Sequence, residues 1–150
     1  MNHYHPLNVF DVAQFFINKA PKINKIKLQR LLYYAQGYSL AKYNQVLFEE
    51  PIEAWPYGPI ISAVYAETLK QEFQKQAYFD FSSQMTHAPF TAEQKALLEQ
   101  VFYDFGKMRT KQLRQKPAND LPWQKTYHPQ KLFSACIIKP SLFLRYFKSS

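Results

Sequence analysis

The hydrophobic positions of this chain recur mainly every three or four residues, which is the spacing of one face of a helix. The most regular run begins at Asn24, a good N-cap residue, and continues to about residue 43. Its apolar residues form one face and spread onto a flank, so we expect most of this helix to be buried as the central element of the fold. Its core-face positions are Leu28, Leu31, Leu32, Ala35 and Tyr38.

Two features of this central helix need an explanation. Gly37 lies inside it and costs about 1 kcal/mol relative to alanine, which indicates either the close approach of another element or a tolerated defect. Lys22, Lys25 and Lys27 crowd its start, where positive charge opposes the helix dipole. These lysines are either solvated or used for something other than folding.

Capping residues, prolines and apolar spacing predict further helices on both sides of the central one. We expect a helix over residues 9–20 capped by Asn8, one from Pro59 to about residue 71, one over residues 92–105 with a Thr91–Gln94 capping box and Gly106 at its end, a short basic helix after Thr110, a short piece with Pro122 near its first turn, and a last helix from Pro140.

The connection after the central helix holds a small non-helical piece. Residues 46–56 alternate poorly and contain Pro51, so any strand there should be short and at a sheet edge. Trp55 precedes a proline and is pushed towards extended geometry, while Gly58 can adopt a positive φ. The Trp-Pro-Tyr-Gly-Pro segment is therefore predicted to be a rigid turn that presents two rings.

These elements predict an all-α, single domain over residues 1–150, built around the central helix at about 24–43, with an extended or hairpin piece near 46–56. The composition is 47% hydrophobic and 17% aromatic, enough to bury a core. Residues 1–7 are polar and are expected to be flexible.

The sequence also bears on the compartment. The N-terminus lacks a signal-peptide pattern, and no apolar run approaches the roughly 18 residues that span a bilayer. One cysteine, Cys136, cannot form an internal disulfide, and we interpret it as a small buried hydrophobe rather than a nucleophile. We expect a cytoplasmic protein with no membrane contact.

Charge is distributed unevenly. The net charge is +8, but residues 1–106 hold 9 Lys/Arg and 10 Asp/Glu, whereas residues 107–150 hold 10 Lys/Arg and only Asp120 as an acid. This basic last third favours an acidic partner, either nucleic acid or an acidic protein surface. A solvated face is the alternative, and composition does not separate the two.

Catalytic and metal-binding patterns are weak. No Gly-x-Ser-x-Gly elbow accompanies the four histidines, and three glycines cannot form a phosphate-cradling loop. His3 and His5 alone do not complete a zinc site. The acids Glu49, Glu50 and Glu53 fit a solvated loop better than an acid site. We therefore expect no enzyme activity, no cofactor and no metal.

One long stretch resembles a known family. The run KIKLQRLLYYAQGYSLAKYNQVLFEEPIEAWPYGPIISAVY resembles the signature of the Panacea domain, which includes SocA-like antitoxins and phage-associated GepA-like proteins. The match is strongest over residues 8–70, and the later Leu-Pro-Trp at 121–123 resembles the family's C-terminal Pro-Trp. Arg30 stands where lysine is more usual, and residues 110–123 depart from the family pattern.

The resemblance implies a helical antitoxin of a toxin–antitoxin system that binds its co-encoded toxin protein directly. In the SocA-like branch it also implies an adaptor that delivers the toxin to a Clp-type protease. The alternative is a nucleic-acid-binding phage-associated or regulatory protein that uses the basic last third, for which no helix-turn-helix spacing is visible.

Candidate contact residues follow from ring chemistry and charge, since Trp, Tyr and Arg most often anchor interfaces. Trp55 is equally well explained as a core ring that locks the turn onto the central helix. The candidate partner-binding residues are Trp55, Tyr57, Tyr34, Lys27, Arg30, Lys111 and Arg114, and the motif residues expected to be structural are Leu28, Leu31, Leu32, Ala35, Gly58 and Pro59.

Overall fold

The computed structural model describes residues 4–113, 117–130 and 136–147, and it is organised around one helix, α2 (Lys25–Tyr43). The Asn24 side chain accepts a hydrogen bond from the Lys27 backbone N–H at 2.8 Å, and the helix ends at Asn44, which is left-handed with φ 53°. Every residue from 28 to 40 is buried. The prediction of a central buried helix at about 24–43 is therefore confirmed.

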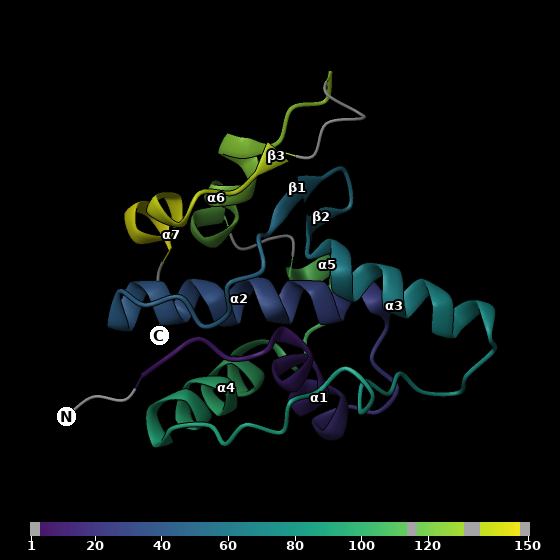
Figure 1. The fold of residues 1–150 in the computed structure, drawn as a ribbon. Coiled ribbons are helices and arrows are strands. Elements are labelled where there is room, and N and C mark those ends of the chain that lie inside the picture. Colours follow the sequence, from purple (N-terminus) through teal and green to yellow (C-terminus); the bar gives the residue numbers. More distant parts are fainter. Residues whose placement is uncertain (1–3, 114–116, 131–135, 148–150) are drawn as a thin grey trace.

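The other elements form layers on two sides of α2. Helices α1 and α4 lie on one side, and the small sheet, α6 and α7 lie on the other (Figure 1). The remaining helices are α1 (Val9–Lys19), α3 (Ser62–Phe73), α4 (Ala92–Phe105), α5 (Thr110–Leu113), α6 (Pro117–Thr126) and α7 (Pro140–Tyr146). None of the described helices is both long and apolar enough to cross a membrane.

Local capping explains where α1 and α4 begin. The Asn8 side chain accepts a hydrogen bond from the Phe10 backbone N–H at 2.7 Å. At α4, Thr91 and Gln94 each accept from the other's backbone N–H, at 3.0 and 2.9 Å, which is a complete capping box. Both helix starts were predicted from sequence and are confirmed.

A three-stranded antiparallel sheet corrects the all-α prediction: the fold is mostly helical but not entirely so. Its strands are β1 (Glu53–Trp55), β2 (Gly58–Ile60) and β3 (Cys136–Ile137), in the order β2-β1-β3. An extended or hairpin piece was expected near residues 46–56; the hairpin is present but lies later, with β1 inside that range and β2 beyond it. The prediction that a strand here lies at a sheet edge is wrong for β1, because β3 pairs with its other side and places Ala54 opposite Cys136.

The positions predicted from sequence for two prolines, relative to the starts of their helices, are wrong. Pro59 does not begin a helix but lies in β2 opposite Ala54, and α3 starts only at Ser62. Pro122 lies inside α6 rather than in its first turn, because the helix already begins at Pro117. At Pro59 the hairpin pairing overrides the preference of proline for a first helical turn, whereas in α6 that position is taken by Pro117.

Residues 1–7 were expected to be flexible, but Tyr4 and Leu7 pack against the body, and residues 1–3 lie outside the described residues. Tyr4 and Leu7 are buried, at 8% and 4% exposure. The Leu7 backbone N–H donates to the Leu47 carbonyl at 2.7 Å, and the Tyr4 ring lies 5.2 Å from that of Tyr43. The tyrosine hydroxyl is also hydrogen-bonded to Ser39.

Gly37 allows the C-terminal end of the chain to approach α2. A Cβ atom at this position would lie 2.5 Å from the ring of Phe147, which follows α7. The same ring contacts Tyr33, Tyr34 and Tyr38, with centroids 5.7 to 5.9 Å apart. Of the two explanations for Gly37, the close approach of another element is confirmed.

Candidate partner-binding surface

The β1–β2 hairpin forms a corner that presents one exposed ring. Gly58 has φ +117°, a conformation that L-residues rarely adopt, so the predicted positive φ is confirmed. Tyr57, at the tip, is 53% exposed. Trp55 is half-buried: its indole Nε1 donates to Glu53 at 2.8 Å and its ring packs edge-on against Tyr65 at 5.4 Å. The corner therefore offers Tyr57 to a partner more fully than Trp55.

A buried ion pair lies beneath this corner. The Arg30 guanidinium on α2 donates to the Asp120 carboxylate on α6 at 2.5 Å, with the side chains only 3% and 6% exposed. Arg30 also packs under Gly58, where an added Cβ would lie 2.9 Å from Nη2. Arg30 Nε is buried with no hydrogen-bond partner among the described residues. The pair thus fixes the corner relative to α2 and α6.

Trp123 ties α6 to the same corner. Its indole Nε1 donates to the Trp55 carbonyl at 2.8 Å, and its ring stacks on Tyr127 at 5.0 Å. A pocket of about 150 Å³ lies at the corner and is lined by Arg30, Pro56, Tyr57, Gly58, Asp120 and Trp123. The late Pro-Trp of the sequence is thereby part of the scaffold that supports Tyr57.

A glutamine on α2 holds the segment that follows the hairpin. The side-chain amide of Gln29 accepts from the Ile61 backbone N–H at 2.7 Å and donates to the Ile61 carbonyl at 3.3 Å. Gln36 acts similarly two helical turns further along the same face, accepting from the Leu47 backbone N–H at 2.7 Å and donating to the Phe48 carbonyl at 2.8 Å. Polar side chains of α2 thus satisfy the backbone of connecting chain that is itself buried.

Two of the predicted contact residues lie in the interior. Arg30 and Tyr34 are 2% and 0% exposed, so a partner cannot contact their side chains in this conformation. Tyr34 stacks on Phe105 at 4.1 Å and donates its hydroxyl to the Leu113 carbonyl at 2.7 Å. Burial raises its pKa to about 12. Sequence did not distinguish these residues from surface ones, because each also has a polar group that can serve in recognition.

The four structural motif residues on α2 lie in the core, whereas Pro59 lies in β2. Leu28, Leu31, Leu32 and Ala35 are fully buried in the core. They explain why the central pattern is so regular, because each of these positions faces packed neighbours rather than solvent.

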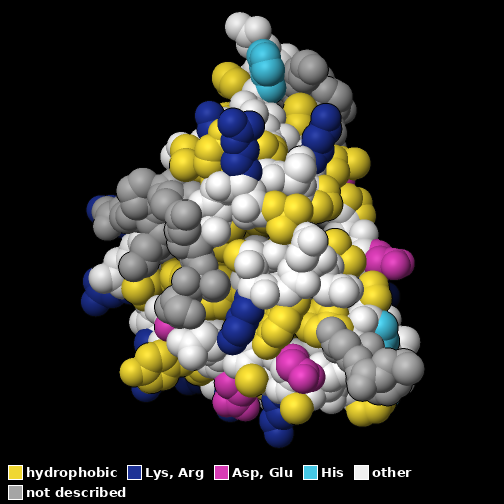
Figure 2. Space-filling view, turned by 90° about the vertical axis from the view of Figure 1, so that its left-hand side faces the viewer, with side chains coloured by type: hydrophobic (Ala, Val, Ile, Leu, Met, Phe, Trp, Pro, Cys, Tyr) yellow, Lys and Arg dark blue, Asp and Glu magenta, His cyan; other side chains and the backbone are white. Residues whose placement is uncertain are grey.

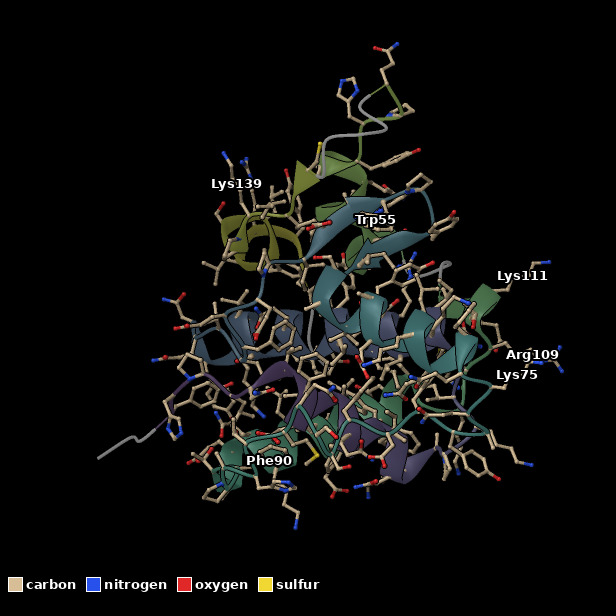
Figure 3. The ribbon with its side chains drawn as sticks, turned by 45° about the vertical axis from the view of Figure 1, so that its right-hand side comes forward. Trp55, Lys75, Phe90, Arg109, Lys111 and Lys139 are labelled. Atoms are coloured by element: carbon tan, nitrogen blue, oxygen red, sulfur yellow. The ribbon has the colours of Figure 1, made fainter. Side chains whose placement is uncertain are left out.

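Two basic clusters that are distant in sequence meet at the N-terminal end of α2. The Asn24 amide lies 3.4 Å from the Thr110 hydroxyl, which brings the start of α2 beside the start of α5. Arg109, Lys111 and Lys75 lie on this same side of the molecule (Figure 3).

Of the basic candidate contact residues, Lys27 is half-buried and burial lowers its pKa. Arg114, the remaining candidate, lies outside the described residues.

The face at the opposite end of α2 also carries charge. There, Lys/Arg side chains gather in the upper part of the view, and Asp/Glu side chains lie lower, among hydrophobic and further Lys/Arg ones (Figure 2). The lysines of the N-terminal end are less balanced: Lys25 pairs with Glu72 at 3.0 Å, while Lys22 and Lys27 line an adjoining groove. The N-terminal end of α2 thus has a groove lined by lysines, while Lys/Arg side chains also gather on another face.

The groove at this basic end lies between the α1–α2 connection and the segment after α3. One part has a volume of about 550 Å³ and an adjoining part about 460 Å³, and Tyr78 belongs to both walls. Tyr78 is 51% exposed. The other residues that line the groove include Ala20, Pro21, Lys22, Ile23, Lys27, Glu72 and Phe79. The groove is lined by apolar side chains together with charged ones, mainly lysines, which suits an amphipathic segment.

The residues with potential catalytic or metal-binding chemistry are scattered in the structure. Among the described residues, no group of three or more His, Cys, Asp and Glu could hold a metal ion. Cys136 is half-buried in β3 rather than fully buried as expected. His87 is exposed in the loop after α3, and Glu53 accepts the hydrogen bond from Trp55.

Comparison with known proteins assigns the family. Residues 28–124 match the model described as antitoxin SocA-like, Panacea domain. The chain belongs to this family. No curated protein and no solved structure gives a match. The resemblance noted in the sequence is thus confirmed over most of the chain.

The limits of the Panacea domain correspond to the contacts just described. It begins at Leu28 in α2, just before Arg30, and ends just after Asp120 and Trp123 in α6. It therefore includes both members of the buried ion pair, the whole corner and α3. Asp120 was missed as a site residue, although its position as the sole acid of the basic last third was a signal in the sequence.

Proposed function

We propose that this Panacea-domain protein is an antitoxin that neutralises a co-encoded toxin by direct protein–protein binding. The observation that supports this most directly is the family match over residues 28–124. Antitoxin families act on toxin partners, and the surface of this chain offers groups suited to a protein contact.

The corner supplies a pre-ordered contact. Tyr57 is exposed, while the turn beneath it is held by the Arg30–Asp120 pair and by the hydrogen bond from Trp123 to the Trp55 carbonyl. A ring on an already rigid turn loses little conformational entropy on binding, so more of its contact energy remains as affinity. Tyrosine is also enriched among residues that dominate interface energetics.

The basic end supplies charge complementarity. Lys22, Lys27, Arg109 and Lys111 lie near one another at the start of α2 and α5. Clustered charge of one sign speeds association with an oppositely charged surface and selects against partners of the same sign. We therefore propose that the toxin presents an acidic surface.

Co-expression with the neighbouring gene in the genome tests the proposal. We expect the neighbour alone to stop growth and this chain to restore it, and we expect the two proteins to co-purify. A neighbour that is harmless, or that stays toxic beside this chain, contradicts the antitoxin role. Toxin abundance in rescued cells separates two modes: sequestration leaves it unchanged, whereas delivery to a Clp-type protease lowers it.

Nucleic-acid binding is the second candidate function, and the meeting of the α2 and α5 cations at one end favours it over a merely solvated charge. The expected signature is binding to duplex DNA or RNA that weakens steeply with added salt, because bound cations release counterions from phosphates. No retention in a mobility-shift assay at low salt removes this candidate.

A further inference from the structure

Helix α3 has two opposite faces, and the less apolar one is buried. Its buried residues are Val64, Thr68 and Gln71, of which two are polar. On the other side, Leu69 and Phe73 are 43% and 89% exposed. An exposed pair of large apolar side chains beside a polar buried face is the reverse of what folding alone favours.

The buried face of α3 is held by hydrogen bonds. The Gln71 amide accepts from the Asp80 backbone N–H at 2.9 Å and donates to the Asp80 carbonyl at 2.7 Å, and Thr68 donates to the Tyr65 carbonyl at 2.7 Å. The two Gln71 bonds tie α3 to the segment that follows it, whereas the Thr68 bond lies within the helix. Leu69 and Phe73 are thus kept facing solvent rather than left there by a loosely attached helix.

The exposed positions form a continuous stripe. Ala66, Leu69 and Phe73 are spaced by three and four residues, the seam along which two helices pack. Ala66 is small and permits close approach of a second helix. The helix itself extends beyond the N-terminal end of α2, so its outer side is not covered by the layers of the fold (Figure 1).

We propose that this outer α3 stripe, Ala66, Leu69 and Phe73, binds an amphipathic helix of the toxin that carries acidic residues beside its apolar seam. The proposal rests on the antitoxin function above and identifies where the toxin docks. The stripe adjoins the corner, since the Tyr65 ring of α3 contacts Trp55 at 5.4 Å.

Charge around the stripe selects the occupant. Lys70 is exposed next to Leu69. The basic groove is lined by Lys22 and Lys27, and by Glu72 from the end of α3 that carries Phe73. Glu72 is already paired with Lys25, so it does not offset the other lysines. A second copy of this chain docked through the same stripe would bring its own Lys70 and groove lysines towards these, which opposes self-association. An acidic partner helix meets no such repulsion.

A double substitution and a matched control test the stripe. Leu69→Ser with Phe73→Ser removes the apolar seam, and Tyr103→Ser removes a ring that is 85% exposed on α4, away from the stripe. Toxin affinity is measured by titration calorimetry, rescue by co-expression, and folding by thermal unfolding. We expect the double variant to bind at least about tenfold more weakly while Tyr103→Ser binds like the wild type, both with nearly unchanged unfolding temperatures.

The outcomes separate the surface from the function. If the wild type rescues growth and the double variant binds toxin equally well, the stripe is not the docking site and the proposal is overturned. A wild-type dimer in light scattering that the double variant converts to monomer, with toxin affinity unchanged, overturns it in favour of a second copy. Stripe-dependent binding to duplex nucleic acid without toxin binding also overturns it. If the wild type itself fails to rescue, the antitoxin function and the occupant assigned here are both wrong.

Discussion

The Arg30 guanidinium donates to the Asp120 carboxylate at 2.5 Å, although 90 residues separate the two in sequence. The contact joins the central helix α2 to α6 and lies directly beneath the exposed corner. Because both side chains are buried, each charge depends on the other for compensation. The pair therefore connects the stability of the Panacea domain to the geometry of its candidate partner-binding surface.

Asp120→Ala is expected to lower the free energy of unfolding by about 3–5 kcal/mol, because it leaves the Arg30 charge buried without its partner. Urea denaturation followed by circular dichroism measures this. The control is Glu99→Ala, which breaks the Lys19–Glu99 pair, whose side chains are 39% and 46% exposed. That change should cost less than about 1 kcal/mol. Equal losses in both variants would show that the buried pair is no more important than a surface one.

Gly58→Ala is expected to lower the free energy of unfolding by about 1–3 kcal/mol, because alanine is strained at φ +117° and its Cβ would approach the Arg30 guanidinium. Tyr57→Ala, one residue earlier and exposed, should leave stability nearly unchanged and is the matched control. Thermal and urea unfolding of the two variants measure this difference in stability. A Gly58→Ala protein as stable as the wild type would mean that the corner tolerates movement.

Stability should fall at alkaline pH because of Tyr34. Its pKa is raised by burial from 10.0 to about 12, so between these values the unfolded chain loses a proton that the folded chain keeps. The stabilisation is complete below pH 10 and is lost as pH rises towards 12, by up to about 2–3 kcal/mol. Burial also raises the pKa of Tyr33, which acts in the same direction.

Urea unfolding over this pH range, with tyrosinate absorbance recorded in parallel, measures the Tyr34 effect. The Tyr34→Phe variant loses its hydrogen bond to the Leu113 carbonyl and should be less stable at pH 8. Its stability should also fall less steeply with pH than that of the wild type. Identical slopes in the two proteins would assign the pH dependence to other groups.

Reversing charge at Lys111 and Arg114 to glutamate should weaken toxin binding while leaving the unfolding temperature nearly unchanged. Lys111 is exposed on α5 and projects at the basic end of the molecule (Figure 3). Electrostatic steering should make the loss larger at low salt. Lys95→Glu on α4 is the control, because its helix begins just after Phe90, on the other side of the molecule in that view. Unchanged affinity in the double variant would show that this charge serves only solvation.

The helices themselves follow largely from short-range information. The Asn8 and Asn24 caps, the Thr91–Gln94 capping box and the positive φ of Gly58 each depend on residues within a few positions of one another. Such effects leave a local pattern in the sequence, so element positions and family could be predicted from it. The helix start expected at Pro59 is wrong because strand pairing with Ala54 competes with the preference of proline for a first helical turn, and the one expected near Pro122 is wrong because α6 already begins at Pro117.

The sequence by itself determined the central helix, most helix starts, the rigid corner and the family to which the chain belongs. Only the tertiary structure decided that Arg30 and Tyr34 are interior, that β3 covers the second edge of β1, and that the lysines before α2 meet those of α5. It also decided which face of α3 looks outwards. These outcomes depend on contacts between residues tens of positions apart. Such contacts have no local periodicity, because the side chain that neutralises Arg30 or covers a strand can come from any part of the chain that folds back onto it.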